Sequence, residues 1–310
     1  MRQRLVRATT FAACVLIVVF ITLFAMRLRT APSPRWTCRH HRPKGRTQPV
    51  TGSGPSIAVV AIFKNEAHIL NEWCAHYFRE GISHIYLIND QSSDMWEPEI
   101  QEFGDRITSV VTDDSWTLAH GHRQKYFYNK FCSKVKEHHD WLAVLDLDEF
   151  MYSRPPYPTI QAYLTTLPSR IGQIEVLWAP FGSSGYDRSP PSVVKYYKWR
   201  GRMPESVQRL LPEIRFVPNF KAIIRTNNFD RLWVHRAQTK GLDKLRMLGA
   251  ADDPLKLNHY QIQSKEFWTN KMKRGSVRGR KHDHARTWQK FHKMDYKDVY
   301  DTELANKTYA

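Results

Sequence analysis

Three carboxylates fall within four positions at the end of an apolar run, in the segment WLAVLDLDEF from Trp141 to Phe150. The residues from Trp141 to Leu145 have the continuous apolar pattern of a strand that is buried on both faces. Asp146 and Asp148 are two positions apart, so on an extended chain their side chains point the same way. Carboxylates arranged in this way suit one divalent cation whose other ligands are water and phosphate. The segment therefore predicts a D-x-D metal site.

Polar residues also follow two other predicted strands. The apolar run IAVVAIF, which begins at Ile57, is followed by Asn65 and Glu66, and the run from Ile85 to Ile88 is followed by Asp90. In an open α/β sheet the carboxyl ends of parallel strands meet at the edge where ligands bind. We therefore expect these three side chains beside the D-x-D motif. Asn65 and Glu66 are also common at helix N-termini, which leaves a purely structural role open.

The elements that must position these residues alternate between strand and helix. From Glu66 to Glu80 apolar residues recur every three or four positions, and Gly81 occupies a C-cap position. Ile107 to Val111 predicts a third strand and Gly121 to Lys136 a further helix. This order predicts an α/β fold with a mixed, mostly parallel sheet flanked by helices. The sequence contains no G-x-G-x-x-G and no G-x-x-x-x-G-K motif, so neither a classical dinucleotide fold nor a P-loop is supported.

The amino-terminal part of the chain has a different composition. Residues 8–26 carry no charge over about 19 positions and would span about 28 Å as a helix. We expect a cytoplasmic tail at residues 1–7, a transmembrane anchor at 8–26, a basic Pro-rich stem at 27–55 and a catalytic domain at 56–310. Basic residues flank the anchor on both sides, so the positive-inside rule does not fix its orientation. A short tail before a large domain favours a type II protein whose domain lies in the lumen of the Golgi or another part of the secretory pathway.

The segment from Ala61 to Asp94, together with WLAVLDLDEF, resembles the glycosyltransferases of family 92 and their relatives in the family-2-like group. The other matching motifs follow in the same order and extend the resemblance over nearly all of Ile57 to Gly275: FGSSGYDRSP from Phe181, KAIIRT from Lys221, VHRA from Val234 and LNHYQIQSKEFWTNKMKRG from Leu257. The resemblance implies a GT-A-type fold, a D-x-D metal site that usually holds Mn²⁺, and inverting transfer. Characterised members of the family use UDP-galactose, so a UDP-sugar donor and a glycan or glycoconjugate acceptor are expected.

The resemblance also implies roles for single residues. Asn65, Glu66 and Asp90 would bind uracil and ribose. Asp146 would face the ribose and the metal ion, and Asp148 the metal ion and the diphosphate. His259 would be a further ligand of Mn²⁺ or Mg²⁺, with His235 a weaker candidate, although a packed core histidine is the alternative. Three basic residues at the end of a predicted helix from Ser264 to Lys273 face either the diphosphate or the helix dipole: Lys271, Lys273 and Arg274.

Inverting transfer also needs a base near the acceptor hydroxyl. Asp187 is the candidate because it follows the glycine-rich loop from Gly182 to Gly185, although a turn that requires glycine explains this loop equally well. Where relatives commonly have a histidine after this loop, the chain has Tyr186. The other carboxylates that remain open as the base are Glu205, Glu213 and Asp230.

The formal net charge of +17 allows two interpretations. It fits a surface that attracts an anionic sugar nucleotide and an anionic glycan. It also fits a metal-dependent phosphodiesterase or nuclease, because clustered carboxylates serve two-metal phosphoryl chemistry too. The membrane anchor argues against a nucleic-acid partner, and retention of both aspartates argues against an inactive membrane-tethered binding protein. We also expect Asp148 to be dispensable for folding, because it lies beyond the buried strand.

The cysteines and the glycosylation sequon add two expectations. Cys74 and Cys132 each lie among apolar residues of a predicted helix, which favours buried thiols over a disulfide. Asn306, Lys307 and Thr308 form the only N-glycosylation sequon, and its position near the carboxyl terminus leaves its use open.

Overall fold

The computed structural model describes residues 54–113, 115, 122–202, 220–239, 241–274 and 286–309 of the 310-residue chain. The tail at 1–7, the anchor at 8–26 and nearly all of the stem at 27–55 lie outside these described residues. Within the described ranges, every helix is too short or too polar to cross a bilayer.

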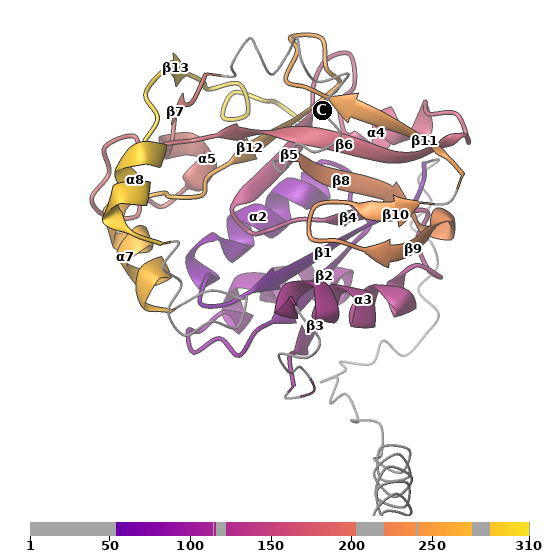
Figure 1. Cartoon of the computed structure of the whole chain (residues 1–310), viewed down its shortest axis with the longest axis horizontal. Coiled ribbons are helices and arrows are strands. Elements are labelled where there is room, and N and C mark those ends of the chain that lie inside the picture. Colours follow the sequence, from indigo (N-terminus) through magenta and orange to yellow (C-terminus); the bar gives the residue numbers. More distant parts are fainter. Residues whose placement is uncertain are drawn as a thin grey trace, which may run out of the picture. The chain divides into compact units, whose positions relative to one another are not determined.

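In the described part of the chain, nine strands form one mixed sheet, shown in Figure 1. The path runs β3-β2-β1-β4-β8-β6-β12-β5, and β11 pairs with β6 at its side. The bounds of these strands are β1 Ile57–Phe63, β2 His84–Asn89, β3 Ile107–Val111, β4 Trp141–Val144, β5 Glu149–Ser153, β6 Ile171–Pro180, β8 Phe220–Arg225, β11 Asp243–Met247 and β12 Leu255–His259.

The first half of the sheet is parallel, as the sequence predicts. β1 pairs in parallel with β2 and β4, and β2 pairs in parallel with β3. Phe63 is the partner of Asn89, and Asn89 the partner of Val111, so these strands end at one edge. Every residue of β1 and β4 is buried. The polar residues that follow β1, β2 and β4 therefore emerge together at the carboxyl edge.

Helices α2 (Ala67–Arg79) and α3 (Arg123–Val135) lie beside this half of the sheet (Figure 1). The odd-numbered residues of β1 share one apolar core with Trp73 and Tyr77 of α2. The even-numbered residues point to the opposite face, since side chains alternate along a strand, and α3 also packs against β1. Gly81 ends α2 with a φ of +85°, the left-handed conformation predicted for a C-cap.

The second half of the sheet mixes strand directions, in agreement with the predicted mixed, mostly parallel sheet, although the sequence pattern did not indicate which strands run antiparallel. β8 runs antiparallel to both β4 and β6, which places a late segment of the chain next to the D-x-D strand. β12 pairs in parallel with β6 and antiparallel with β5, so that His259 is the register partner of both Pro180 and Glu149. These pairings bring residue 259 to the D-x-D turn.

Smaller elements complete the described fold. Two-stranded sheets join β9 to β10 and β7 to β13, and the remaining helices are short. Their bounds are η1 Glu97–Arg106, α4 Ile160–Thr165, α5 Val193–Tyr196, β7 Trp199–Arg200, η3 Thr226–Asn228, β9 Phe229–Leu232, β10 Ala237–Thr239, α7 Lys265–Lys273, α8 Trp288–Met294 and β13 Val299–Tyr300. α7 begins at the N-cap Ser264, whose side chain accepts a hydrogen bond from the backbone N–H of Phe267. Cys74 and Cys132 are buried free thiols, as predicted.

Candidate active site

The D-x-D residues lie in the turn between β4 and β5, and two aromatic residues of α2 hold this turn by hydrogen bonds. The indole N–H of Trp73 donates to the backbone carbonyls of Asp146 and Glu149, at 3.1 and 3.0 Å. The hydroxyl of Tyr77 also donates to the Glu149 carbonyl, at 2.9 Å. The turn therefore rests on two buried aromatic side chains of one helix.

Asp146 receives partners from two other elements. Nζ of Lys221, on β8, lies 2.9 Å from Oδ2 of Asp146, and Nε2 of Gln124, on α3, lies 2.9 Å from Oδ1. The Lys221 side chain is fully buried. Asp146 is thus held between β8 and α3, and the local sequence pattern does not indicate that these two elements meet at the motif.

Glu149 is the buried neighbour of this pair. Its Oε2 accepts a hydrogen bond from the backbone N–H of Asp146 at 2.9 Å and lies 3.2 Å from Nζ of Lys221. Burial raises the pKa of Glu149 well above its usual range, and Lys221 opposes this only in part. Burial alone would lower the pKa of Lys221, but Asp146 and Glu149 outweigh it and raise that pKa. Lys221 is therefore a fixed cation beneath the motif.

Asp148 is paired with residues from the carboxyl-terminal part of the chain. Nζ of Lys271, on α7, lies 2.7 Å from Oδ2 of Asp148, and Nε2 of His259 lies 3.4 Å from Oδ1. Burial opposes ionisation of Asp148, but Lys271 and His259 lower its pKa well below the usual range. Asp148 is only 7% exposed. The prediction that folding tolerates its loss assumed an exposed side chain, whereas Asp148 is buried and paired; its removal would leave the buried Lys271 ammonium without its carboxylate, at an expected cost of about 3–5 kcal/mol.

His259 meets the D-x-D motif as predicted, and it is also packed. Its ring lies over Trp178, with centroids 4.2 Å apart, and the following residue Tyr260 donates its backbone N–H to the Asp148 carbonyl at 2.7 Å. His235 also contacts this indole, at 5.5 Å between centroids. Burial lowers the pKa of His235 to about 4. His259 is therefore a packed residue that also lies beside Asp148, and its role as a metal ligand stays a prediction.

The three residues predicted to bind the nucleotide lie at the same edge, each held by its own partner. Oδ1 of Asp90 lies 2.6 Å from Nη2 of Arg123, and Oε1 of Glu66 lies 2.8 Å from Nη2 of Arg274. Asn65 has a φ of +51°, and its Oδ1 accepts from the backbone N–H of Ser93 at 2.7 Å. Glu66 is the N-cap residue of α2, but its side chain makes no capping hydrogen bond.

Asp187 stands apart from this group. Its side chain is 76% exposed and its carboxylate lies 2.8 Å from Nζ of Lys265. Among the described residues no contact joins it to Asp146 or Asp148. The glycine loop before it is explained by packing and turn geometry, because the backbone of Tyr296 fills the space of a Cβ at Gly182 and Gly185 has a φ of +83°.

The other candidate bases give no stronger case. Glu205 and Glu213 lie outside the described residues, and Asp230 is exposed at the start of β9. Of the basic residues predicted near the diphosphate, Lys271 and Arg274 contact the predicted site, whereas Lys273 is exposed.

The donor set fits a divalent cation through two side chains. Oδ1 of Asp148 and Nε2 of His259 are 3.4 Å apart, close to the roughly 3 Å between adjacent ligands of an octahedral ion with bonds of about 2.1 Å. Within the described ranges, no three His, Cys, Asp or Glu side chains gather in one potential metal cluster. The predicted three-ligand set with Asp146 is therefore not formed, since Asp146 faces Lys221. Two ligands still suffice where substrate phosphates complete the shell.

The sequence did not assign roles to two cations, one amide and one aromatic side chain that contact the predicted site residues. Lys221, Arg123, Gln124 and Trp178 were not assigned roles, although each contacts a predicted site residue. One signal was available: KAIIRT begins with a lysine directly before three apolar residues of a buried strand. A charge in such a position requires a buried partner.

Comparison with known proteins gives a family match. A family model described as glycosyltransferase family 92 matches residues 56–300. A protein of Oryza sativa subsp. japonica, named as a glycosyltransferase family 92 protein, is 23% identical over 261 residues. The match covers 83% of this chain but 39% of the rice protein, so the chain spans less than half the length of that relative.

Solved structures with related topology are more distant. Glucosyl-3-phosphoglycerate synthase from Mycobacterium tuberculosis, solved with Mn²⁺, UDP and glucosyl-3-phosphoglycerate, is 15% identical, with 61% of this chain and 63% of that chain covered and a TM-score of 0.32. S. aureus TarS 1–349 is 11% identical, with 69% and 62% covered and a TM-score of 0.36. Because both TM-scores are low, neither likeness carries weight in the conclusions below.

Proposed function

The chain belongs to glycosyltransferase family 92, and from this premise we propose that it transfers a hexose from a UDP-sugar to a glycan or glycoconjugate. Galactose is the first candidate for the sugar, and the proposed transfer inverts the anomeric centre. The protein is a glycosyltransferase by its family. The donor, the acceptor class and the stereochemistry are our proposal.

One observation carries the proposal: acidic and basic side chains are paired at the carboxyl edge of the sheet. Asp90, Asp146 and Asp148 lie at the ends of parallel strands, and each is paired with a cation from another element, Arg123, Lys221 and Lys271 respectively. A UDP-sugar presents hydroxyls that suit the carboxylates and a diphosphate that suits the cations. A site built from carboxylates alone would repel the diphosphate.

The roles that we propose for the single residues follow from these ion pairs. Lys271 is proposed to bind the diphosphate. When donor and metal ion are bound, its partner Asp148 would contact the metal ion, and the Lys271 ammonium would then be available to the diphosphate. Lys221 is enclosed beneath Asp146 and Glu149, so it holds the motif rather than contacting the donor. Asp90 and Glu66 are proposed to hold the uridine.

A divalent cation, Mn²⁺ or Mg²⁺, is part of the proposal. Asp148 and His259 would hold it, and when bound it would neutralise negative charge on the leaving diphosphate. Trp178 packs against the His259 ring in a tilted arrangement and limits its rotation, which keeps Nε2 directed at Asp148.

In the transfer step, the acceptor oxygen forms a bond to C1 of the sugar while the bond from C1 to the diphosphate oxygen breaks. UDP leaves with that electron pair, and a base removes the proton of the acceptor hydroxyl. Asp187 remains the candidate base. Because its side chain is exposed, Asp187→Asn should leave thermal stability unchanged, and a loss of kcat would then report on catalysis alone.

We also propose that residues from Arg27 onward are lumenal, with residues 8–26 as the anchor in a Golgi or other secretory membrane. The uncharged segment supports this assignment. Protease added to sealed vesicles should spare the catalytic domain until detergent is added. Digestion without detergent would reverse the proposed orientation.

The deciding experiment follows nucleotide release by the full-length protein, offered a panel of UDP-sugars and GDP-sugars with Mn²⁺ and candidate glycan acceptors. We expect release with a UDP-hexose, its loss in excess chelator, and at least about a hundredfold loss in Asp148→Asn. The exposed Asp252→Asn is the matched control, and thermal unfolding of each variant separates catalytic from folding effects. Equal activity of Asp148→Asn and wild type would overturn the site, and phosphodiester cleavage without sugar transfer would overturn the function.

A further inference from the structure

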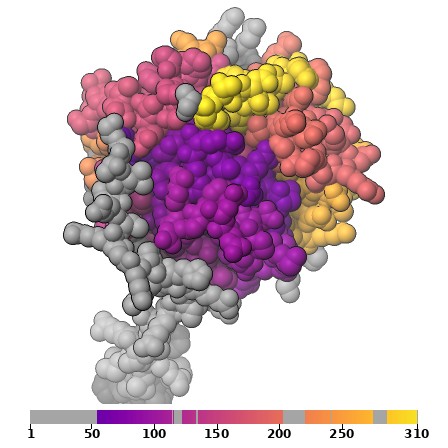
Figure 2. Space-filling model, turned by 180° about the vertical axis from the view of Figure 1, so that it is seen from behind, coloured from indigo at the N-terminus to yellow at the C-terminus, as the bar shows by residue number. Residues whose placement is uncertain are grey.

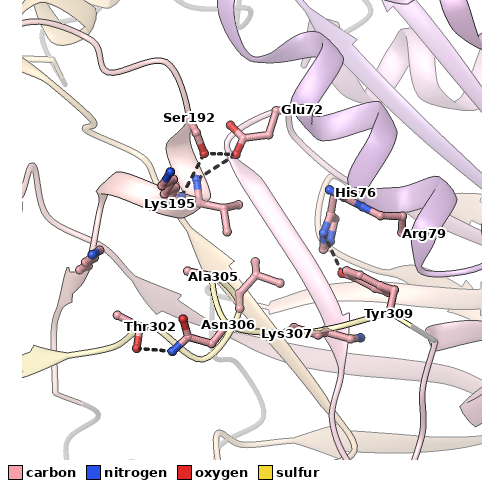
Figure 3. A pocket seen from close by; sticks show the side chains of 13 residues that line it. Glu72, His76, Arg79, Ser192, Lys195, Thr302, Ala305, Asn306, Lys307 and Tyr309 are labelled. Atoms are coloured by element: carbon pink, nitrogen blue, oxygen red, sulfur yellow. Dashed lines mark hydrogen bonds between the residues drawn. The ribbon is translucent and has the colours of Figure 1, made fainter.

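A cavity of about 380 Å³ lies away from the D-x-D motif, between α2, α5 and the carboxyl-terminal segment (Figure 3). None of the residues that line it is a D-x-D residue or a partner of one. Figure 2 shows the face where the yellow carboxyl-terminal segment and the salmon segment lie beside indigo and purple residues. The cavity is therefore a feature of a second region of the domain.

Three cations at this cavity have no acidic partner within the part of the chain that the structure describes. Arg79, Lys195 and Lys198 line it, and among the described residues no carboxylate forms an ion pair with any of them. Arg79 instead lies over the ring of Tyr309, at 5.3 Å from the centroid. Guanidinium and ammonium groups that line one cavity, without an ion-pair partner among the described residues, are a charge pattern that favours an anionic ligand.

The carboxylates nearest the cavity are already engaged. Glu72 caps α5: its oxygens accept from the Ser192 hydroxyl and from the backbone N–H of Val193, each at 2.6 Å (Figure 3). Glu80 is buried and is bound by Lys307 and by the Tyr309 hydroxyl, the latter at 2.9 Å. Neither carboxylate is free to neutralise Arg79, Lys195 or Lys198.

The cavity also offers groups that suit a sugar. Thr302 and Asn306 supply a hydroxyl and an amide to its wall, and Tyr309 supplies an aromatic ring (Figure 3). Aromatic faces with neighbouring hydrogen-bonding groups combine apolar contact with polar recognition, as a saccharide requires.

An exposed aromatic pair extends this surface. Trp199 and Tyr300, on the paired strands β7 and β13, are 37% and 56% exposed, and their centroids are 5.2 Å apart. Lys198, which lines the cavity, also lies 5.9 Å from the Tyr300 ring centroid. The aromatic pair and the cationic cavity are therefore adjoining parts of one surface.

We propose that this surface is a second carbohydrate site, which binds an acidic saccharide. Arg79, Lys195 and Lys198 bind its carboxylate or sulfate group, and Trp199 and Tyr300 contact a neighbouring sugar ring. Binding of a saccharide at this surface requires no transfer reaction. The inference therefore extends beyond the proposed function and can be tested separately from it.

The test is isothermal titration of the full-length protein with a sulfated disaccharide, the same disaccharide without sulfate, and sodium sulfate. We expect the sulfated disaccharide to bind more tightly than either other probe. Arg79→Gln/Lys195→Gln should raise its Kd at least about tenfold, because two charge-assisted contacts are lost. Tyr300→Ala should also raise the Kd of the sulfated disaccharide, but should leave that of sulfate unchanged.

The matched control is Lys244→Gln/Lys293→Gln, which removes the same charge from exposed positions on β11 and α8. It should bind the sulfated disaccharide as wild type does. An equal loss in this control would overturn the site in favour of a general charge effect. Equal binding of the neutral disaccharide, or of sulfate alone, would overturn the acidic-saccharide assignment. The cavity variants should keep the nucleotide-release activity. If wild type showed no such activity, the proposed transferase function would be refuted, but the proposal of a saccharide site at this cavity would not be affected.

Discussion

Nζ of Lys221 lies 2.9 Å from Oδ2 of Asp146, although 75 positions separate the two residues. Strand β8 makes this contact possible, because it runs antiparallel between β4 and β6 and presents its first residues to the D-x-D turn. The same ammonium is 3.2 Å from Glu149. A single buried cation thus compensates two of the three carboxylates of the motif.

Lys221→Met should destabilise the protein by about 3–5 kcal/mol, because Asp146 and the buried Glu149 lose their cation. Transferase activity should fall as well, since the D-x-D turn loses a contact that positions it. Chemical denaturation measures the free energy of unfolding.

The double variant Lys221→Met/Glu149→Gln should recover part of that stability, because the neutral amide leaves less buried charge unpaired. Lys244→Met, at an exposed position of β11, controls for the loss of a positive charge. If Lys221→Met were as stable as wild type, the lysine would not be the compensating charge that we infer.

His259→Ala should raise the Mn²⁺ concentration needed for half-maximal transferase activity by about 10- to 100-fold, if His259 is the second side-chain ligand of the ion. It should also lower thermal stability, because the ring packs on Trp178 at 4.2 Å. Titration of activity with Mn²⁺ and thermal unfolding without the metal separate these two effects.

Trp178→Leu tests the packing contribution, since it removes the indole and leaves both proposed ligands in place. It should lower stability with a smaller change in the metal requirement. An unchanged Mn²⁺ requirement in His259→Ala would assign the histidine to the core only.

Asp90→Asn should raise KM for the UDP-sugar by about tenfold, because a charged hydrogen-bond acceptor is lost at the predicted uridine site. The asparagine keeps a carbonyl oxygen for Arg123 and Thr112, so kcat should change less than KM. Initial rates over a range of donor concentrations give both constants. The control is Asp113→Asn. Asp113 follows the neighbouring strand β3 and pairs with Lys130, and its replacement should leave KM unchanged. Equal KM values for wild type and Asp90→Asn would remove Asp90 from the donor site.

Acid should destabilise the fold between about pH 6.5 and pH 4. Burial lowers the pKa of four histidines from 6.5 to about 4: His76, His84, His139 and His235. Below pH 6.5 the unfolded chain binds protons that the folded chain does not bind until about pH 4. The free energy of unfolding therefore decreases as the pH is lowered through this window. Urea denaturation at several pH values measures the slope.

A single variant makes the acid prediction specific. His84→Gln keeps a polar group for Thr108, whose hydroxyl lies 2.9 Å from the histidine Nε2. It should reduce the slope of stability against pH by nearly one proton. A slope equal to that of wild type would show that His84 does not contribute to the acid sensitivity.

The periodicity of the sequence determined the parallel half of the fold and the residues at its edge. The predicted strand from Ile107 to Val111 is observed with the same bounds, and the helix predicted between Glu66 and Glu80 occupies Ala67–Arg79. Asn65, Asp90 and Asp146 follow from these elements, because a continuous apolar run ends where polar residues begin. Such information is local, so one sequence is sufficient to extract it.

Only the tertiary structure decided which cation meets which carboxylate. Lys221 reaches Asp146 and Lys271 reaches Asp148 through β8 and α7, whose positions depend on strand order over more than 70 residues. The exposed position of Asp187 and the cavity closed by Lys307 and Tyr309 have the same origin. Local patterns record which side chains are buried, whereas the partner of a buried charge is set by long-range packing, and no periodicity encodes it.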